Sequence, residues 1–183
     1  METNQPKRSL FIVSSLFPPH LGGVERYTAS LARTLSRDFQ VTVICMNTEG
    51  MPEKRVMDGV TVWSLSCVPL FSGRLPLPTP GAFRRFRALL SENPIDGALI
   101  QTRLYPLNVF AVREFKRRRI PTITIEHGTN HVDMGSALVN CVWRAYEHGL
   151  AAIFRRTSSA FFGVSAAAVR WLSHFGIAGN GVI

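Results

Sequence analysis

The chain has 183 residues, of which 46% are hydrophobic and 18% charged, and a formal net charge of +9. This much apolar surface excludes a disordered segment, and no run approaches the roughly 18 apolar residues that a membrane-spanning helix needs. The positive charge favours anionic partners, which include nucleic acid, an anionic membrane face and phosphorylated substrates.

Short β-branched runs alternate with helical periodicities along the chain. The predicted strands are residues 9–15, 40–46, 60–65, 96–101, 121–126 and 159–164. The first helix begins after Gly23, with Val24, Tyr27, Leu31 and Leu35 at helical spacing, and later helices cover 82–92, 106–119, 137–154 and 166–175. This order predicts an α/β fold with a Rossmann-like open, mainly parallel sheet and helices on both faces. Ligands of such sheets bind at the carboxyl ends of the strands.

The segment of residues 68–81 interrupts the alternation, because it has too many prolines for a regular element and is unusually apolar for a loop. The helix after it sets Phe83, Phe86, Leu89 and Leu90 against Arg84, Arg85 and Arg87. Together the two segments could make a peripheral contact with an anionic membrane. An ordinary sheet-covering helix with a solvated basic face is the alternative.

Cysteine use bears on the compartment. Cys45, Cys67 and Cys141 are odd in number and have neither metal-ligand nor redox spacing, which favours reduced thiols. Lys7 and Arg8 precede an apolar run that is too short for a signal peptide. We therefore expect a cytoplasmic protein, with the inner face of the membrane as a possible place of contact.

Two glycines, Gly22 and Gly23, stand between the first strand and the first helix. Unpaired N–H groups at a helix amino terminus favour an anion, and glycines let a phosphate approach the backbone. The loop lacks the G-x-G-x-x-G and Walker A patterns, so neither a nicotinamide enzyme nor an ordinary ATPase is supported. The other interpretation is a glycine turn that only starts the helix.

Three motifs together resemble those of family 4 glycosyltransferases, which have the GT-B fold. They are Pro18-Pro19-His20-Leu21-Gly22-Gly23-Val24-Glu25-Arg26-Tyr27, Glu126-His127-Gly128-Thr129 and Gly163-Val164-Ser165. The resemblance covers nearly the whole chain and implies that residues 1–183 are the N-terminal, acceptor-side domain, without the C-terminal donor-binding domain. It also implies metal-independent, cofactor-free, retaining transfer of a sugar from a nucleotide diphosphate sugar to a glycan or lipid-linked glycan.

The resemblance assigns roles to three residues. Gly22 and Gly23 would face the donor diphosphate, and His127 would be the family's histidine after the fifth strand. We expect His127 to be catalytic by holding a sugar hydroxyl or the acceptor nucleophile, while the leaving phosphate acts as the base. All three are expected at one edge of the sheet, facing the missing domain. A histidine that caps local backbone is the alternative for His127.

Four residues are expected to contact the acceptor: Arg103, Glu126, Thr129 and Asn130. Arg103 could fork onto an acceptor phosphate or carboxylate, and Glu126 could orient His127 or a hydroxyl. Solvated charges at the sheet edge are the alternative for both residues.

Two nearby features give weaker indications of function. Ser165 either lines the cleft or is the N-cap of its helix. His127, His131 and Asp133 approach metal-ligand spacing, but Gly128 and Asn130 argue against the helix that would align them, so no metal site is predicted.

Two other functions compete with transfer. One is a basic Rossmann-like module that binds anionic lipid or nucleic acid, and the other is a GT-B sugar-nucleotide epimerase. The chain has no recognised nucleic-acid motif, and its aromatic residues fall on core stripes, so no specific nucleic-acid partner is expected.

Overall fold

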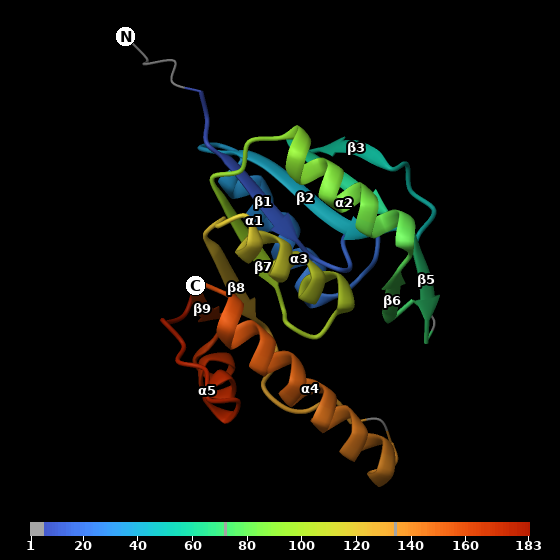
Figure 1. Ribbon diagram of the computed structural model, residues 1–183, viewed down its shortest axis with the longest axis vertical. Coiled ribbons are helices and arrows are strands. Elements are labelled where there is room, and N and C mark those ends of the chain that lie inside the picture. Colours follow the sequence, from blue (N-terminus) through green and yellow to red (C-terminus); the bar gives the residue numbers. More distant parts are fainter. Residues whose placement is uncertain (1–5, 72, 134) are drawn as a thin grey trace. The chain divides into compact units, whose positions relative to one another are not determined.

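The computed structural model describes residues 6–71, 73–133 and 135–183. It divides into two compact units, Met1–Leu99 and Ile100–Ile183, which are described one at a time (Figure 1).

The first unit is built on a mainly parallel sheet. Its strands are β1 (Ser9–Val13), β2 (Gln40–Met46), β3 (Lys54–Met57) and β4 (Val60–Leu65), in the order β3-β4-β2-β1, with the start of β7 (Gly97–Gln101) after β1. Strands β1, β2 and β4 run parallel, and β3 pairs antiparallel with β4. Ile12 lies beside Val43, which lies beside Val62, and all three are fully buried. Strands covered on both faces need such unbroken apolar runs.

Two helices cover this sheet. In Figure 1, α2 (Pro80–Glu92) lies in front of the strands and α1 (Gly23–Leu35) lies behind them. Thr79 caps α2 by accepting a hydrogen bond from the Ala82 N–H at 3.2 Å, and Pro80 takes the first helical position. Phe86 and Leu89 are fully buried, as expected for a helix that covers a sheet. Helix α1 departs from its predicted stripe, because it buries Glu25, Thr28 and Ala32 most deeply.

The proline-rich segment is a β-hairpin, so the prediction that it forms no regular element is wrong. Strands β5 (Cys67–Leu70) and β6 (Leu75–Pro78) pair antiparallel, with Pro69 opposite Pro76. Both strands of a two-stranded ribbon have an open edge, where a missing N–H breaks no ladder. The short exposed strand β3 was also not predicted.

The second unit continues the strand–helix alternation. Its elements are the end of β7, α3 (Pro106–Arg117), β8 (Thr122–Glu126), α4 (Ala137–Thr157), β9 (Ala160–Gly163) and α5 (Ala166–His174). The strand order is β7-β8-β9, and β8 runs parallel to β9. Helix α3 packs against α4 and buries Leu107, Ala111 and Phe115 completely.

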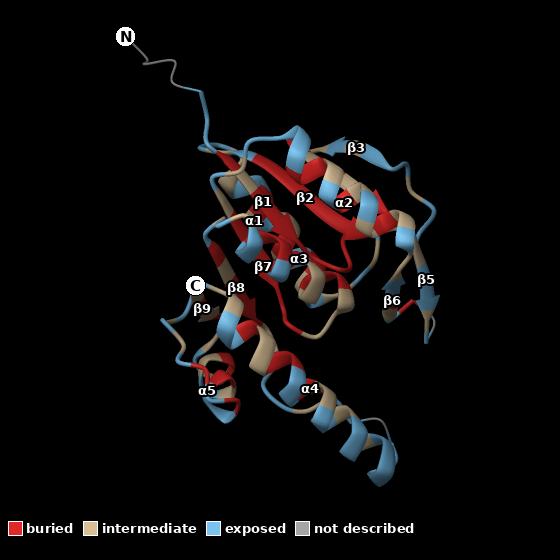
Figure 2. Ribbon diagram, viewed as in Figure 1, coloured by how far each residue is buried: buried red, intermediate tan, exposed pale blue. Residues whose placement is uncertain are grey.

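The predicted fold class, α/β with a mainly parallel sheet, is confirmed. Figure 2 shows buried residues concentrated on β1 and β2, whereas β3 and β5 are largely exposed. Besides the hairpin and β3, some element ends differ: α3 stops at Arg117 instead of residue 119, and α4 continues to Thr157 instead of residue 154. Among the described residues, no helix has the length and apolar character needed to cross a bilayer.

Candidate functional site

The glycine loop in the first unit forms the open amino terminus of α1. Gly22 is the N-cap residue in extended backbone, with no side-chain hydrogen bond to cap the helix. The Arg26 N–H donates to the Gly22 carbonyl at 3.2 Å, and the N–H groups that precede Arg26 in the first turn have no partner within the helix. A Cβ atom on Gly23 would meet nothing within 4 Å. The Gly23 side of this helix end is therefore open to a ligand.

Glu25 closes the other side of the same turn. Its side chain is buried, and a Cβ atom on Gly22 would collide with the Glu25 carboxylate. A negative charge in the first turn stabilises a helix through the dipole. An anion that approached on the Gly22 side would meet this carboxylate, so the Gly23 side is the better route for a phosphate.

Arg103 and Glu126 form a buried ion pair in the second unit. Arg103 follows β7 and Glu126 ends β8, and the Arg103 Nε lies 3.4 Å from the Glu126 Oε2. Both side chains are about 1% exposed, so the alternative of solvated charges at the sheet edge is wrong for both. The Arg103 guanidinium also lies over the Phe175 ring, 3.9 Å from its centroid. Direct acceptor contact by either residue stays a prediction, and it would require the pair to become accessible.

Burial opposes the charge on both partners. Desolvation lowers the pKa of Arg103, and the nearby carboxylates of Glu126 and Glu147 oppose that change. Desolvation also raises the pKa of Glu126, although Arg103 and two backbone N–H groups counteract it. The attraction between the two charges therefore has to offset the cost of burying both of them.

The turn that leads from β7 to Arg103 has a strained backbone. Thr102 has a positive φ of 62°, which is unusual for a β-branched residue. The buried amide of Asn108 donates to the carbonyls of Gln101 and Thr102, at 2.6 and 2.9 Å. The Thr102 N–H donates to the Ile125 carbonyl at 2.8 Å. These contacts hold the end of β7 beside β8.

Glu126 also shapes the turn that follows β8. Its Oε1 accepts hydrogen bonds from the N–H groups of His127 and Gly128, at 3.1 and 2.9 Å. A Cβ atom on Gly128 would lie only 3.2 Å from this oxygen, so glycine suits the close approach. One carboxylate thus holds both Arg103 and the backbone that carries His127.

His127 is a neutral imidazole in this turn. Its Nε2 lies 2.7 Å from the Gln101 Oε1, and because an amide oxygen only accepts, Nε2 carries the proton. Burial lowers the pKa of His127 to about 4. This contact joins His127 to a side chain on the neighbouring strand, and the role of His127 in catalysis stays a prediction. His127 has the form needed to hold a hydroxyl near neutral pH.

The remaining predicted residues are in different surroundings. Thr129 and Asn130 are exposed in the loop between β8 and α4. Ser165 is the N-cap of α5, since its side chain accepts from the Ala168 N–H at 3.2 Å. His131 and Asp133 do not act together, because the Asp133 carboxylate accepts from Gly135 and Asn140 instead.

Sequence reasoning missed several residues of this region. Gln101 and Asn108 hold the histidine and the strained turn, and the polar run Gln101-Thr102-Arg103 after an apolar strand was the available signal. Glu147 is a buried carboxylate on α4 with no local pattern to reveal it. A hollow of about 420 Å³ in the first unit also went unpredicted; Asn47, Ser66 and Arg85 are among its lining residues.

The fold is that of one half of a GT-B enzyme. Sucrose-phosphate synthase from Thermosynechococcus elongatus matches with a TM-score of 0.68 and 14% identity, over 96% of this chain and 47% of that protein. HepE of Anabaena, solved with UDP-glucose, matches with a TM-score of 0.60 and 13% identity, over 92% and 41%. UDP-N-acetylglucosamine 2-epimerase from Rickettsia bellii matches with a TM-score of 0.56 and 13% identity, over 94% and 43%. The chain spans less than half the length of these structures.

The model of Glycosyltransferase Family 4 matches residues 21–182. The chain therefore belongs to glycosyltransferase family 4, and its identification as an N-terminal domain of that family with the GT-B fold is confirmed. A sequence search of curated proteins found no match.

Proposed function

We propose that this chain is the acceptor-side half of a glycosyltransferase that moves a sugar from a nucleotide diphosphate sugar to an acceptor hydroxyl, with retention of configuration. The observation that carries the proposal is the neutral His127 at the end of β8, held by Gln101 through Nε2. In this tautomer, Nδ1 carries the lone pair and can accept a hydrogen bond from a hydroxyl. His127 would orient the acceptor, while the leaving phosphate takes its proton.

The donor diphosphate would be bound by backbone at the start of α1. The open space beside Gly23 supports this role, since nothing lies within 4 Å of where its Cβ would be. The first-turn N–H groups that have no partner within the helix, together with the helix dipole, favour an anion there. The chain offers no other part of a donor site that the sequence reveals, so a second lobe with the nucleotide pocket is part of the proposal.

Acceptor recognition would fall to exposed side chains of the β8–α4 loop. Thr129 and Asn130 can exchange hydrogen bonds with sugar hydroxyls, and both are exposed. Arg103 and Glu126 would act indirectly, by positioning His127, because both side chains are buried. Their test as acceptor ligands is whether acceptor affinity changes in their conservative variants.

The experiment uses a protein in which this chain is joined to its second lobe. UDP-glucose is the first donor to test, because HepE was solved with it. Release of UDP that depends on an added glycan acceptor supports transfer, and the anomeric configuration of the product tests retention. Conversion of the nucleotide sugar to an epimer would instead favour the epimerase alternative, which the fold alone leaves open.

Two variants test whether His127 acts in the transfer reaction. His127→Ala should lower transfer at least tenfold, by more than any loss of folded protein explains, because it removes the group that holds the acceptor hydroxyl. If the variant loses activity only in proportion to lost folded protein, His127 is structural. Gln101→Glu gives a second reading, because a carboxylate at Oε1 would favour the protonated imidazole and so weaken acceptance from a hydroxyl.

A further inference from the structure

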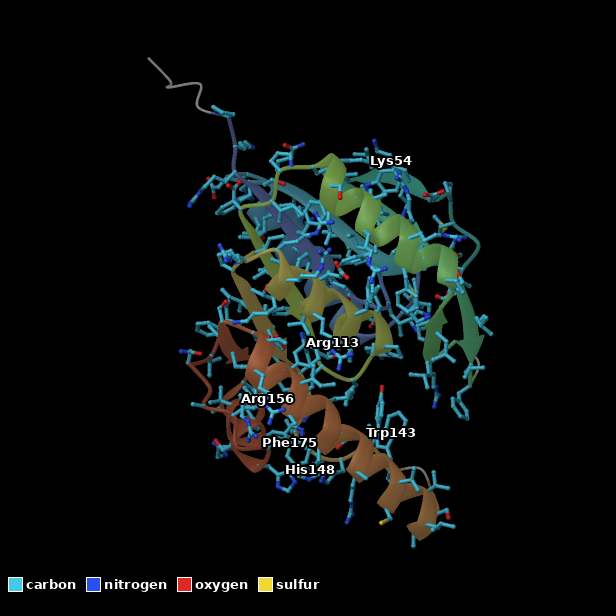
Figure 3. The ribbon with its side chains drawn as sticks, viewed as in Figure 1. Lys54, Arg113, Trp143, His148, Arg156 and Phe175 are labelled. Carbon is cyan, nitrogen blue, oxygen red and sulfur yellow. The ribbon has the colours of Figure 1, made fainter. Side chains whose placement is uncertain are left out.

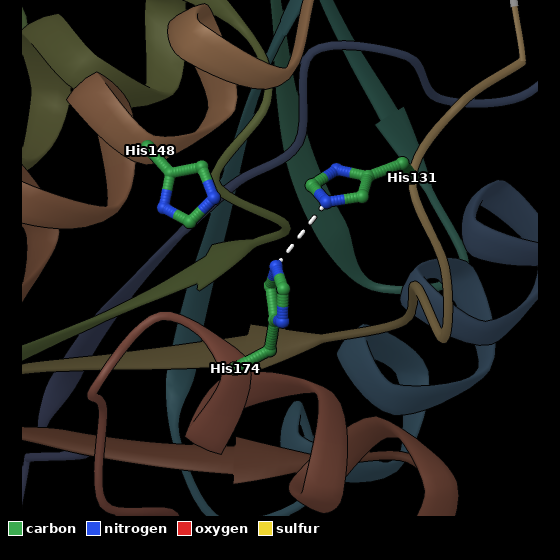
Figure 4. Close-up of side chains that lie close together, drawn as sticks. All are labelled: His131, His148 and His174. Carbon is green, nitrogen blue, oxygen red and sulfur yellow. Dashed lines mark hydrogen bonds between the residues drawn. The ribbon is translucent and has the colours of Figure 1, made fainter.

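Three histidines from separate elements of the second unit meet at its surface (Figure 4). His131 lies in the loop after β8, His148 lies on α4, and His174 is the last residue of α5. Each offers one ring nitrogen, and these three atoms all lie within 4.8 Å of one another. The Nε2 atoms of His131 and His174 are only 3.2 Å apart.

We propose that His131, His148 and His174 bind a divalent transition-metal ion, with Zn²⁺ as the expected ion. Around a tetrahedral zinc ion with Zn–N distances of about 2.0 Å, neighbouring ligand nitrogens lie about 3.3 Å apart. His131 and His174 already have this separation. His148 is exposed, so rotation of its side chain can bring the third nitrogen to the ion.

A buried carboxylate prepares His131 for this role. Glu147 hydrogen-bonds to the His131 Nδ1, and its other oxygen accepts from the Trp143 indole N–H at 3.0 Å. An imidazole that donates Nδ1–H to a carboxylate directs the lone pair of Nε2 outward, as a metal ligand must. This arrangement also accounts for a carboxylate that is about 1% exposed on α4.

Aromatic rings hold the other two ligands. The Trp171 indole stacks on the His174 ring with centroids 4.8 Å apart and an angle of 7°. Phe175 lies beside His148, with centroids 4.9 Å apart (Figure 3). Besides the rotation of His148, binding needs a tautomer change at His174, because the present contact places a proton between the two Nε2 atoms of His131 and His174.

The donor set indicates the metal class. Neutral imidazoles suit Zn²⁺, Ni²⁺ and Cu²⁺, whereas Mg²⁺ and Ca²⁺ prefer oxygen ligands. The exposure of His148 and His174 leaves a fourth position for water. Such an ion would join the β8–α4 loop to α4 and α5 and so order the loop that follows His127. This inference does not depend on the proposed transfer reaction.

The test is a Zn²⁺ titration of untagged chain in competition with a chromogenic chelator. We expect one ion per chain, and at least tenfold weaker binding in each of the variants His148→Ala and His174→Ala, whose side chains are exposed and so dispensable for folding. His20→Ala is the matched control, because His20 lies in the first unit and should leave the affinity unchanged. Glu147→Gln, which removes the carboxylate that hydrogen-bonds to the His131 Nδ1, should weaken Zn²⁺ binding about 10- to 100-fold.

Two further readouts separate the site from adventitious binding. Zn²⁺ should raise the Tm of the parent chain but not that of the double variant His148→Ala/His174→Ala. Co²⁺ should give the visible absorption of a tetrahedral site in the parent chain alone. Equal Zn²⁺ affinity in the parent chain and the double variant, or no binding at equimolar Zn²⁺, would overturn the proposal.

Discussion

The Arg103 Nε lies 3.4 Å from the Glu126 Oε2, and both side chains are shielded from solvent. Among the described residues, three buried atoms of this pair have no hydrogen-bond partner: Arg103 Nε and Nη2, and Glu126 Oε2. Removing one partner of a buried ion pair lowers the free energy of unfolding strongly, because the other charge is then buried without compensation. The two residues should therefore depend on each other.

We expect Arg103→Met to lower the free energy of unfolding by about 3 kcal/mol, because it leaves the Glu126 carboxylate buried without its partner. Glu126→Gln should cost a similar amount through the unpaired guanidinium, although its amide oxygen can still accept from the His127 and Gly128 N–H groups. Urea denaturation at pH 7.5 measures both.

The double variant supplies the control for this pair. Arg103→Met/Glu126→Gln should lose at least 1 kcal/mol less than the sum of the two single variants. Strict additivity would mean that the two charges do not interact, despite their distance.

Gly23→Val tests the anion route at the start of α1. The substitution should leave the Tm nearly unchanged, since a Cβ there meets nothing within 4 Å, but should lower turnover of the joined enzyme about 100-fold by blocking donor approach. Gly149→Val is the matched control, because Gly149 on α4 also has open space around it. A variant at Gly23 with normal turnover would remove the loop from donor binding. Gly22→Ala should differ from both by lowering stability, because it displaces Glu25.

His127 should make folding stability depend on acidity. Its pKa is about 4 in the fold against 6.5 as the ordinary value, so the unfolded chain binds the proton first as the pH falls. Stability is then fully present above about pH 6.5 and is lost as the pH drops toward 4, by about 2 kcal/mol after allowance for partial exposure. Urea denaturation from pH 7.5 to 4.5 should show a smaller loss in His127→Gln than in the parent chain. A His127 imidazole NMR signal that titrates near pH 6.5 would contradict this prediction.

The β5–β6 hairpin is the apolar surface that supports the membrane prediction. Val68, Phe71 and Leu77 are exposed on it, whereas Phe86 and Leu89 of α2 are buried and so unavailable for lipid contact. Phe71→Ser should weaken binding to anionic vesicles about tenfold, the effect of losing one inserted aromatic ring. Val56→Ser on β3 is the control, since Val56 is also exposed but lies outside the hairpin. Equal vesicle binding by the two variants, or tighter binding to random DNA than to vesicles at moderate salt, would argue against this contact.

Much of the fold follows from local patterns. Unbroken apolar runs such as residues 40–46 predicted the buried strands, because a strand covered on both faces has no polar side. The helix start at Gly23 was also predictable, since a glycine pair between a strand and a helical stripe is a local signal. The β5–β6 hairpin was not, because its prolines are tolerated only where a strand edge stays unpaired.

The sequence by itself determined the order of the parallel strands and of the helices that alternate with them, and the family resemblance gave two glycines and one histidine their expected roles. Only the tertiary structure decided that Arg103 meets Glu126 inside the second unit, that Gln101 holds His127, and that His131, His148 and His174 come together. Periodicity along the chain specifies which side of its own element a residue occupies. It does not specify which distant residue faces it there, because that depends on how neighbouring elements are arranged in space.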